Sequence, residues 1–154
     1  METGAEFSEC GKYRYLLYRI WDKEKPSAMC VGLNPSTADA TSNDPTIKRL
    51  ISLLKNNGYG SLYMTNLFAL VSPYPEDLRL CPDPIKDNDL WLEKISMYCS
   101  DVILCYGNFK QSEYRRKIVS KIISKPELCF GKNTNGTPKH PLYLKTDTKL
   151  QRLA

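Results

Sequence analysis

The sequence contains few of the residues from which proteins build metal and redox sites. Its 154 residues include one histidine and six cysteines, and no two cysteines form a C-x-x-C pair. Zinc sites and iron–sulfur clusters need several such ligands at short spacing. We therefore expect no metal ion and no other cofactor, and we expect at least four of the six cysteines to be small buried hydrophobic residues.

Long apolar segments are also missing. No apolar run approaches the roughly 18 residues that suggest a membrane span, and the opening segment, METGAEFSEC, is polar and acidic rather than typical of a secretory signal. We therefore expect a cytoplasmic protein without a membrane partner. The length of 154 residues fits a single domain covering the whole chain, 1–154.

Charge is distributed unevenly along the chain. Residues 102–154 contain 11 basic and 3 acidic side chains, whereas residues 76–101 contain 3 basic and 7 acidic ones. A basic C-terminal third suits a polyanionic partner, such as nucleic acid or the phosphate of a nucleotide. The alternative is a solvated basic surface that only keeps the protein in solution.

Short apolar runs alternate with helical patterns along most of the chain. Strands are expected at the apolar runs 28–33, 62–67, 101–106 and 127–130. Helices are expected between them, at about 44–58, 87–99 and 111–124. This order predicts an α/β fold, a three-layer sandwich with a central, mainly parallel four-stranded sheet in a core at 28–145. Residues 1–22 are expected to add an N-terminal strand or hairpin arm.

In a parallel sheet, ligands bind outside the carboxyl ends of the strands. The segments expected to meet at that edge are 34–44, 66–71, 107–110 and 132–144. The first begins with Asn34 and continues with Ser36, Thr37 and Asp39, all able to face a ligand. It is not a Walker A loop, because it lacks the Gly-Lys-Ser/Thr ending. Asp44 lies at the end of the same segment, where its alternative role is to cap the following helix.

Polar residues also mark the other segments of this edge. Asn66 ends the second strand, where it either binds a ligand or ties adjacent loops together, and Phe68 either stacks on a base or belongs to the core. His140, the only histidine, follows Lys139 and lies between two prolines that restrict the backbone. We expect it to contact a leaving base, a carbonyl or a phosphate; the alternative is a structural histidine.

Several segments resemble known families. The segments CGKYRYLLYRIW (10–21), LNPSTAD (33–39), DPT (44–46), NLFA (66–69) and GTPKHPLY (136–143) resemble the family called domain of unknown function 1643. The order of motifs is also similar to that of the uracil-DNA glycosylase superfamily. GLNP (32–35) resembles the GINPG loop of its mismatch-specific branch, YMTNL (63–67) its second strand, DVILCYG (101–107) its third strand, and His140-Pro141 its HPS motif.

The second resemblance implies a uracil-DNA-glycosylase-like fold and roles for three residues. Asn34 would position the attacking water, His140 would stabilise the departing base, and Asn66 would read the base edge. The chain is short and lacks the extra loops that usually grip a duplex, so a nucleotide or a single-stranded nucleic acid is the expected partner.

We therefore expect a protein that binds a nucleobase or nucleotide and hydrolyses its N-glycosidic bond. The alternative is a non-catalytic protein that binds a nucleotide or signalling molecule, such as a sponge related to phage or bacterial defence. The expected catalytic residues are Asn34, Asp39, Asp44 and His140. The expected base- or nucleotide-binding residues are Gly32, Leu33, Pro35, Ser36, Thr37, Asn66, Phe68, Gly107 and Asn108. The expected phosphate-binding residues are Arg115, Arg116 and Lys139.

Overall fold

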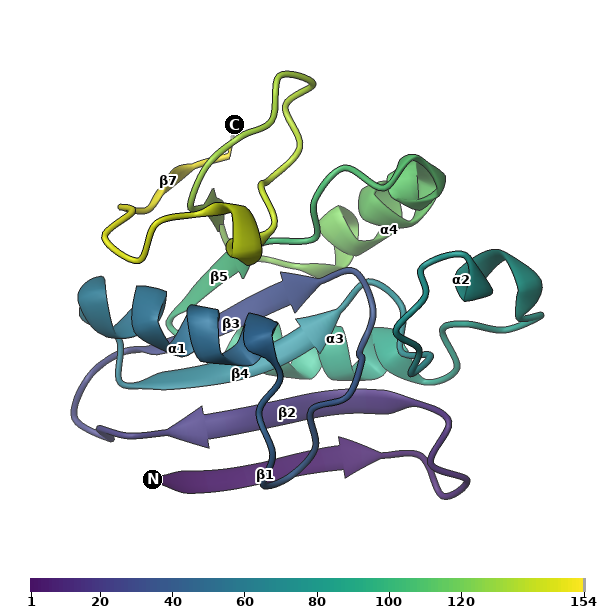
Figure 1. Ribbon diagram of the computed structural model, residues 1–154, viewed down its shortest axis with the longest axis horizontal. Helices are drawn as coiled ribbons and strands as arrows, with labels where there is room; N and C mark the ends of the chain where they lie inside the picture. Colours follow the sequence, from purple (N-terminus) through teal and green to yellow (C-terminus); the bar gives the residue numbers. More distant parts are fainter. Residues whose placement is uncertain (154) are drawn as a thin grey trace.

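The computed structural model describes residues 1–153, which form one mixed sheet of seven strands (Figure 1). The order across the sheet is β1-β2-β4-β3-β5-β6-β7. The strands span Glu2–Phe7 (β1), Arg14–Ile20 (β2), Ser27–Gly32 (β3), Ser61–Asn66 (β4), Asp101–Leu104 (β5), Glu127–Cys129 (β6) and Gln151–Arg152 (β7).

The centre of the sheet consists of the four strands expected from the sequence. β4, β3, β5 and β6 are neighbours and run parallel. The expectation of a four-stranded sheet is nevertheless wrong in extent. β2 and β1 extend one edge antiparallel, and β7 extends the other. β1 gives no sequence signal for a core strand, because its side chains are largely exposed and show no alternating apolar pattern.

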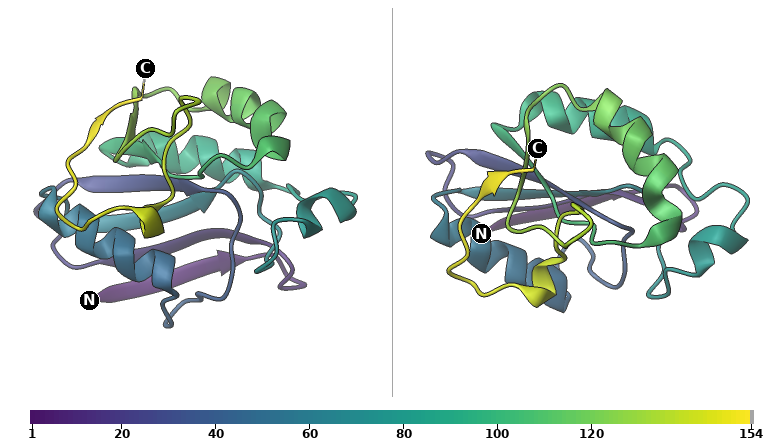
Figure 2. Two further views of the ribbon diagram at one scale, coloured as in Figure 1. Left: turned by 45° about the horizontal axis from the view of Figure 1, so that its top comes forward. Right: turned by 90° about the horizontal axis from the view of Figure 1, so that it is seen from above.

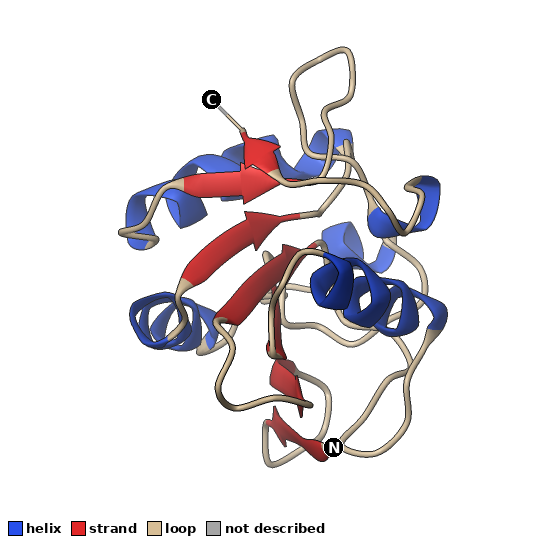
Figure 3. Ribbon diagram, turned by 90° about the vertical axis from the view of Figure 1, so that its left-hand side faces the viewer, coloured by secondary structure: helices blue, strands red, loops and turns tan. Residues whose placement is uncertain are grey.

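Helices cover both faces of the sheet, which gives the expected three layers (Figures 2 and 3). The helices span Pro45–Asn56 (α1), Asp77–Leu80 (α2), Asn88–Tyr98 (α3) and Glu113–Ile122 (α4), with short 3-10 turns at Lys110–Ser112 (η1) and Pro141–Tyr143 (η2). Apolar residues of α1 share a core with Cys30 and Met64, whereas those of α3 and α4 share one with Met29 and Val31. No helix in residues 1–153 is long and apolar enough to cross a membrane.

Helix α1 forms for the local reasons visible in its sequence. Asp44 precedes it in extended conformation and accepts a hydrogen bond from the backbone N–H of Ile47 at 2.9 Å, and Pro45 occupies the first helical position. Ile47, Leu50, Ile51, Leu53 and Leu54 are buried against the sheet. The cap fixes where the helix begins, and the N-terminus of α1 therefore lies at the carboxyl edge of β3.

The C-terminal tail runs back along α1 and brings His140 to the same edge. The Arg49 guanidinium donates to the carbonyl of Leu144. The side-chain amides of Asn56 and Asn57 donate to the carbonyls of Thr146 and Thr148, at 2.7 and 2.9 Å. These three hydrogen bonds, from α1 and from the residue that ends it, hold the tail at residues 144–148, which has little regular structure of its own.

The N-terminal arm contributes to this edge as well, because β2 is antiparallel to β4. The start of β2 therefore lies beside the end of β4, where the Arg14 N–H donates to the carbonyl of Ala69 at 2.9 Å. Arg14 pairs with Phe7, but Leu16 pairs with the adjacent Glu6, which leaves Tyr15 as the extra residue of a β-bulge. A bulge reverses the alternation of side chains along a strand, so Arg14 shares the α1 face of the sheet with Leu17.

Candidate functional site

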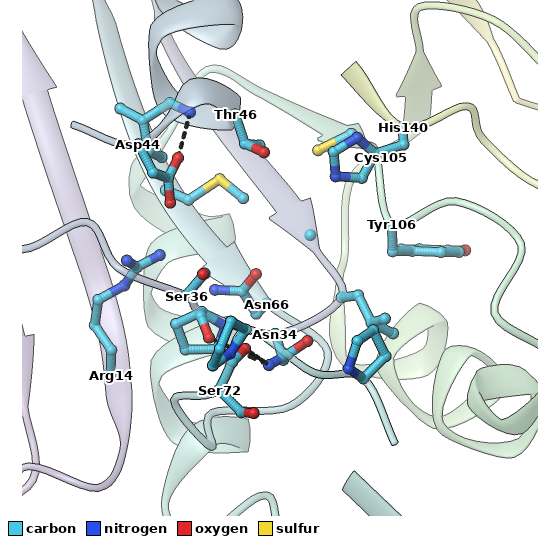
Figure 4. Close-up of a pocket in the computed structure, with 17 residues that line it drawn as sticks. Arg14, Asn34, Ser36, Asp44, Thr46, Asn66, Ser72, Cys105, Tyr106 and His140 are labelled. Carbon is cyan, nitrogen blue, oxygen red and sulfur yellow. Dashed lines mark hydrogen bonds between the residues drawn. The ribbon is translucent and has the colours of Figure 1, made fainter. Parts of the chain in front are cut away.

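A pocket of about 220 Å³ lies at the carboxyl ends of β3, β4 and β5 (Figure 4). The chain passes from β3 through α1 to β4 on one side and then returns to β5 on the other. Such a reversal of strand order is where open α/β sheets bind ligands. The pocket is lined by Arg14, Gly32, Leu33, Asn34, Pro35, Ser36, Asp44, Thr46, Ile47, Met64, Asn66, Ser72, Pro73, Pro75, Cys105, Tyr106 and His140.

Asn34 is held in the pocket wall by its amide nitrogen. Nδ2 donates to the carbonyls of Ser72 and Pro35 at 2.8 and 3.2 Å (Figure 4). It also donates to the carbonyl of Leu70 at 3.3 Å. These contacts join the loop after β3 to the loop after β4. Among residues 1–153, Oδ1 of Asn34 receives no hydrogen bond from the protein. The side chain therefore offers a fixed acceptor to a ligand or a water molecule.

Asn66 is more deeply placed and lacks side-chain partners. Its residue exposure is 3%, and neither its amide nitrogen nor its oxygen has a partner in the described part of the chain. The backbone is fixed instead, because the Asn88 side chain donates to the Asn66 carbonyl at 2.7 Å. A side chain at Gly32 would place its Cβ 2.6 Å from Oδ1 of Asn66, so a glycine is needed here. Neither atom is fully shielded from solvent, so both reach the pocket and can meet a ligand with complementary donors and acceptors.

His140 presents a defined donor to the pocket. The backbone N–H of Leu142 donates to Nδ1 of His140 at 3.2 Å, so the proton of the neutral imidazole lies on Nε2. Burial lowers the pKa of His140, an effect that the negative charge of Asp44 opposes. The imidazole is therefore neutral at pH 7 and can donate a hydrogen bond from Nε2.

Asp44 adds a carboxylate at the N-terminus of α1. One oxygen accepts the capping hydrogen bond from Ile47, and the other receives no hydrogen bond within residues 1–153. The capping role and the ligand-facing role, which are alternatives at the sequence level, are therefore compatible. The free oxygen is the single carboxylate acceptor in the pocket lining.

Arg14 is a pocket residue that sequence reasoning misses. Its residue exposure is 3%, and Nη1 donates to the Ala38 carbonyl at 3.0 Å. Nε is buried without a partner, and no carboxylate lies within 4.0 Å of the guanidinium in residues 1–153. Burial lowers the pKa of Arg14 to about 10, against the opposing charge of Asp44, so the group remains cationic at pH 7. Two facts would have identified it: the antiparallel placement of 10–21 beside the second core strand, and the β-bulge at Tyr15.

Tyr106 forms the wall beside His140. It follows β5, and burial raises its pKa to about 12, so the phenol is neutral at pH 7. The Arg116 guanidinium lies 5.9 Å from the centre of the Tyr106 ring. Tyr106 therefore adds an uncharged and largely buried aromatic wall to the pocket.

The structure thus brings together eight of the residues predicted from the sequence. Gly32, Leu33, Asn34, Pro35, Ser36, Asp44, Asn66 and His140 all line the pocket. Gly107 lies just outside, since a Cβ at this position would be 3.8 Å from Cβ of His140. The lining does not include Thr37, Asp39, Phe68, Asn108, Arg115, Arg116 or Lys139.

Three of these outlying residues have clear structural contacts. Asp39 accepts hydrogen bonds from the backbone N–H groups of Thr41 and Ser42, which lower the pKa of its carboxyl group. Phe68 is buried in the core beneath α3. Arg115 is buried and donates from Nε to the carbonyl of Leu67 at 2.7 Å. It also pairs with Asp89 at 2.5 Å, so its charge already has a partner.

Comparisons with known proteins identify a family. No curated protein and no solved structure matches the chain. In the part of the chain that the structure describes, no cluster of three or more His, Cys, Asp or Glu side chains could hold a metal ion. The family model described as Protein of unknown function (DUF1643) matches residues 14–142, a range that encloses every residue lining the pocket. The chain therefore belongs to this family of proteins of unknown function, DUF1643.

Proposed function

We propose that this protein binds a nucleobase within a nucleotide or single-stranded nucleic acid and hydrolyses its N-glycosidic bond. The observation that carries the proposal is the convergence of Asn34, Asn66, Asp44 and His140 on one pocket at the carboxyl ends of the central strands. These side chains supply acceptors, donors and one carboxylate, the groups needed to read a base edge and to activate water. The expected setting is the cytoplasm.

The chemistry follows from the free atoms of these side chains. Oδ1 of Asn34 holds a water molecule, and the unoccupied oxygen of Asp44 accepts a proton from it. The water oxygen forms a bond to the anomeric carbon of the sugar as the carbon–nitrogen bond to the base breaks, through an oxocarbenium-like transition state. The electron pair of that bond remains on the base, where the Nε2–H of His140 stabilises it by a hydrogen bond.

The resemblance to the uracil-DNA glycosylase superfamily supports the same assignment. It implies a water-positioning role for Asn34, a base-reading role for Asn66 and a leaving-group role for His140. These three residues line one pocket although they lie far apart in the sequence. The missing partners of the Asn66 side chain add independent support, because they leave its full hydrogen-bonding capacity for a base edge.

A second candidate function is binding without cleavage. Asn34 favours it, because an amide cannot take a proton and its nitrogen is already committed to neighbouring carbonyls. Proton transfer then depends on Asp44 alone. In this case, the pocket would sequester a nucleotide or signalling molecule and leave it intact.

A chromatographic assay separates the two functions. Purified protein is incubated with nucleotides and with single- and double-stranded oligonucleotides that contain unmodified or modified bases, and both free base and remaining ligand are measured. The variants are Asn34→Ala, Asp44→Asn and His140→Ala. Asp39→Asn is the matched control, because Asp39 is an exposed carboxylate outside the pocket and an asparagine there retains an acceptor oxygen.

We expect base release by the wild-type protein and the Asp39→Asn control. The Asn34→Ala and Asp44→Asn variants should lose release but still bind the ligand. Depletion of intact ligand without any free base would replace the hydrolase proposal with the binding function. Neither release nor depletion for any of these probes would refute both functions.

A further inference from the structure

Arg14 is the least satisfied charged group in the pocket. Buried side chains with a full charge are normally paired or fully hydrogen-bonded, because removing them from water is costly. Arg19, on the same strand, follows this rule. It is buried, and its guanidinium donates to the side chain of Asn43 and to several backbone carbonyls, the shortest contact being 2.6 Å to Asp39. Arg14 has a single side-chain hydrogen bond, to Ala38.

The unused donors of Arg14 have the geometry of a fork. With Nη1 bound to Ala38, the N–H groups of Nε and Nη2 remain without partners among residues 1–153. These two groups are parallel, as in the fork that matches two oxygens of a phosphate or carboxylate. Nη2 is open to the pocket and meets a ligand oxygen directly, whereas Nε is shielded and meets one only after a shift of the side chain. The β-bulge at Tyr15 is what directs the side chain to this face of the sheet.

Arg14 also lies at a defined end of the pocket. Figure 4 shows its guanidinium on one side and His140 and Tyr106 on the other, with Asn34 and Asn66 between them. β2 and β5 are separated by three strand spacings in the sheet, which corresponds to about 14 Å. Asp44 lines the same pocket, and its carboxylate is close enough to Arg14 and to His140 to oppose the lowering of both pKa values.

This arrangement corresponds to the three parts of a nucleotide placed in line. An oxyanion would meet the cationic guanidinium of Arg14, and the sugar would meet the carboxylate of Asp44. The base would meet the Nε2–H donor of His140 and the side chain of Tyr106. The Asp44 carboxylate does not exclude an anion at the Arg14 end, because its charge is partly compensated by the positive N-terminus of α1.

The burial of Arg14 distinguishes a terminal phosphate from one inside a strand. An internal phosphodiester has an ester arm on each side, and both arms would have to reach a guanidinium that is 3% exposed. A terminal phosphate has one arm and presents its other oxygens freely. We propose that Arg14 binds the terminal phosphate of a free nucleoside monophosphate, which is then the substrate class of the pocket. This inference rests on the proposed function for the position of the base.

The test compares ligands that differ only in phosphate. Isothermal titration calorimetry measures binding of adenosine, guanosine, cytidine, uridine and thymidine, of their 5′-monophosphates, and of oligonucleotides that contain the same bases internally. Inorganic phosphate is titrated as a separate probe. The variants are Arg14→Gln, which removes the charge, and Arg14→Lys, which keeps the charge but loses the fork. Lys48→Gln is the control, since it removes an equal charge from the exposed face of α1.

We expect at least one monophosphate to bind about 10- to 100-fold more tightly than its nucleoside, as charge-assisted hydrogen bonds predict. Arg14→Gln should abolish this difference without weakening nucleoside binding, Arg14→Lys should restore part of it, and Lys48→Gln should not change it. Equal binding of nucleoside and monophosphate by the wild-type protein would overturn the inference, and this comparison does not depend on the folding of any variant.

Two further outcomes separate this inference from the proposed function. Arg14-dependent binding of a monophosphate with no release of base would support the phosphate site and refute the hydrolase. Release of bases from internal positions of oligonucleotides, with no preference for monophosphates, would support the hydrolase and refute the phosphate site. Binding of inorganic phosphate alone, lost in Arg14→Gln, would support an oxyanion site but overturn the nucleotide as its ligand.

Discussion

Replacing Asn34 by aspartate tests the orientation of the amide on which the pocket depends. The side chains are almost the same size, but the Nδ2 donor becomes a second oxygen. That oxygen would face the carbonyls of Ser72, Pro35 and Leu70, now 2.8 to 3.3 Å from Nδ2. Two loops that are joined by a donor would then be separated by electrostatic repulsion.

The expected loss of stability follows from the number of bonds. Nδ2 has two hydrogens, so two good hydrogen bonds are lost in Asn34→Ala, at about 0.5–1.5 kcal/mol each, or about 1–3 kcal/mol in total. Asn34→Asp loses the same bonds and also places a carboxylate against carbonyl oxygens, which raises the cost to about 3–4 kcal/mol. At about 2–4 °C per kcal/mol for a domain of this size, the aspartate variant should melt roughly 6–16 °C below wild type.

Thermal unfolding followed by circular dichroism measures this difference at pH 7 and again near pH 4. At the lower pH, the introduced carboxyl group is partly protonated and regains a donor, so the gap between the variant and wild type should narrow. An aspartate variant that melts within 2 °C of wild type at pH 7 would show that the amide nitrogen of Asn34 does not hold these carbonyls, and the free Oδ1 acceptor assigned to Asn34 would be refuted.

Three other predictions concern single side chains. His140 is the only histidine, so its titration can be followed by the proton NMR signals of a single imidazole. Burial lowers the pKa of His140, so the titration midpoint should lie below 6.5, and the folded state should lose stability as the pH falls below that value. A midpoint above 6.5 would contradict this prediction. Gly32→Ala places a methyl group 2.6 Å from Oδ1 of Asn66 and 2.7 Å from Cε of Met64, so calorimetry should show weaker ligand binding by about tenfold, and the melting temperature should fall because the buried site is overpacked. Unchanged binding would mean that Asn66 does not contact the ligand. Arg115→Ala removes a buried side chain that donates to the Leu67 carbonyl, so the free energy of unfolding measured in urea should fall by about 2–4 kcal/mol. Lost nucleotide binding with an unchanged free energy of unfolding would instead support the phosphate-binding role expected from the sequence.

The central strands and the main helices could be predicted from the sequence because their signals are local. The expected strand at 62–67 is β4, and the helix expected from Asp44 to Gly58 is α1, each within two residues at either end. An apolar run and a capping residue are sufficient in these cases. The arm is different, because pairing of β2 with β4 is set by contacts between distant segments that no local pattern encodes.

The same distinction explains which pocket residues were predicted. Asn34 and Asn66 directly follow or end apolar runs, so topology alone places them at the ligand edge. Arg14 lies inside an aromatic segment, where its position depends on the antiparallel pairing of β2 and on a bulge. Arg115 is the reverse case. Its location in a basic segment predicts phosphate binding, but in the folded protein its side chain is buried and its guanidinium pairs with Asp89.

The bulge at Tyr15 makes the pocket sensitive to the length of the arm as well as to its composition. Side chains alternate along a strand, so removing one residue between Arg14 and Leu17 would turn Arg14 to the opposite face while every pocket residue remained in the chain. A deletion of this kind would leave the net charge at +5 if the residue removed were Tyr15. Relatives that retain an arginine here but lack the extra residue would therefore have the same amino acid in the alignment and a different group in the pocket.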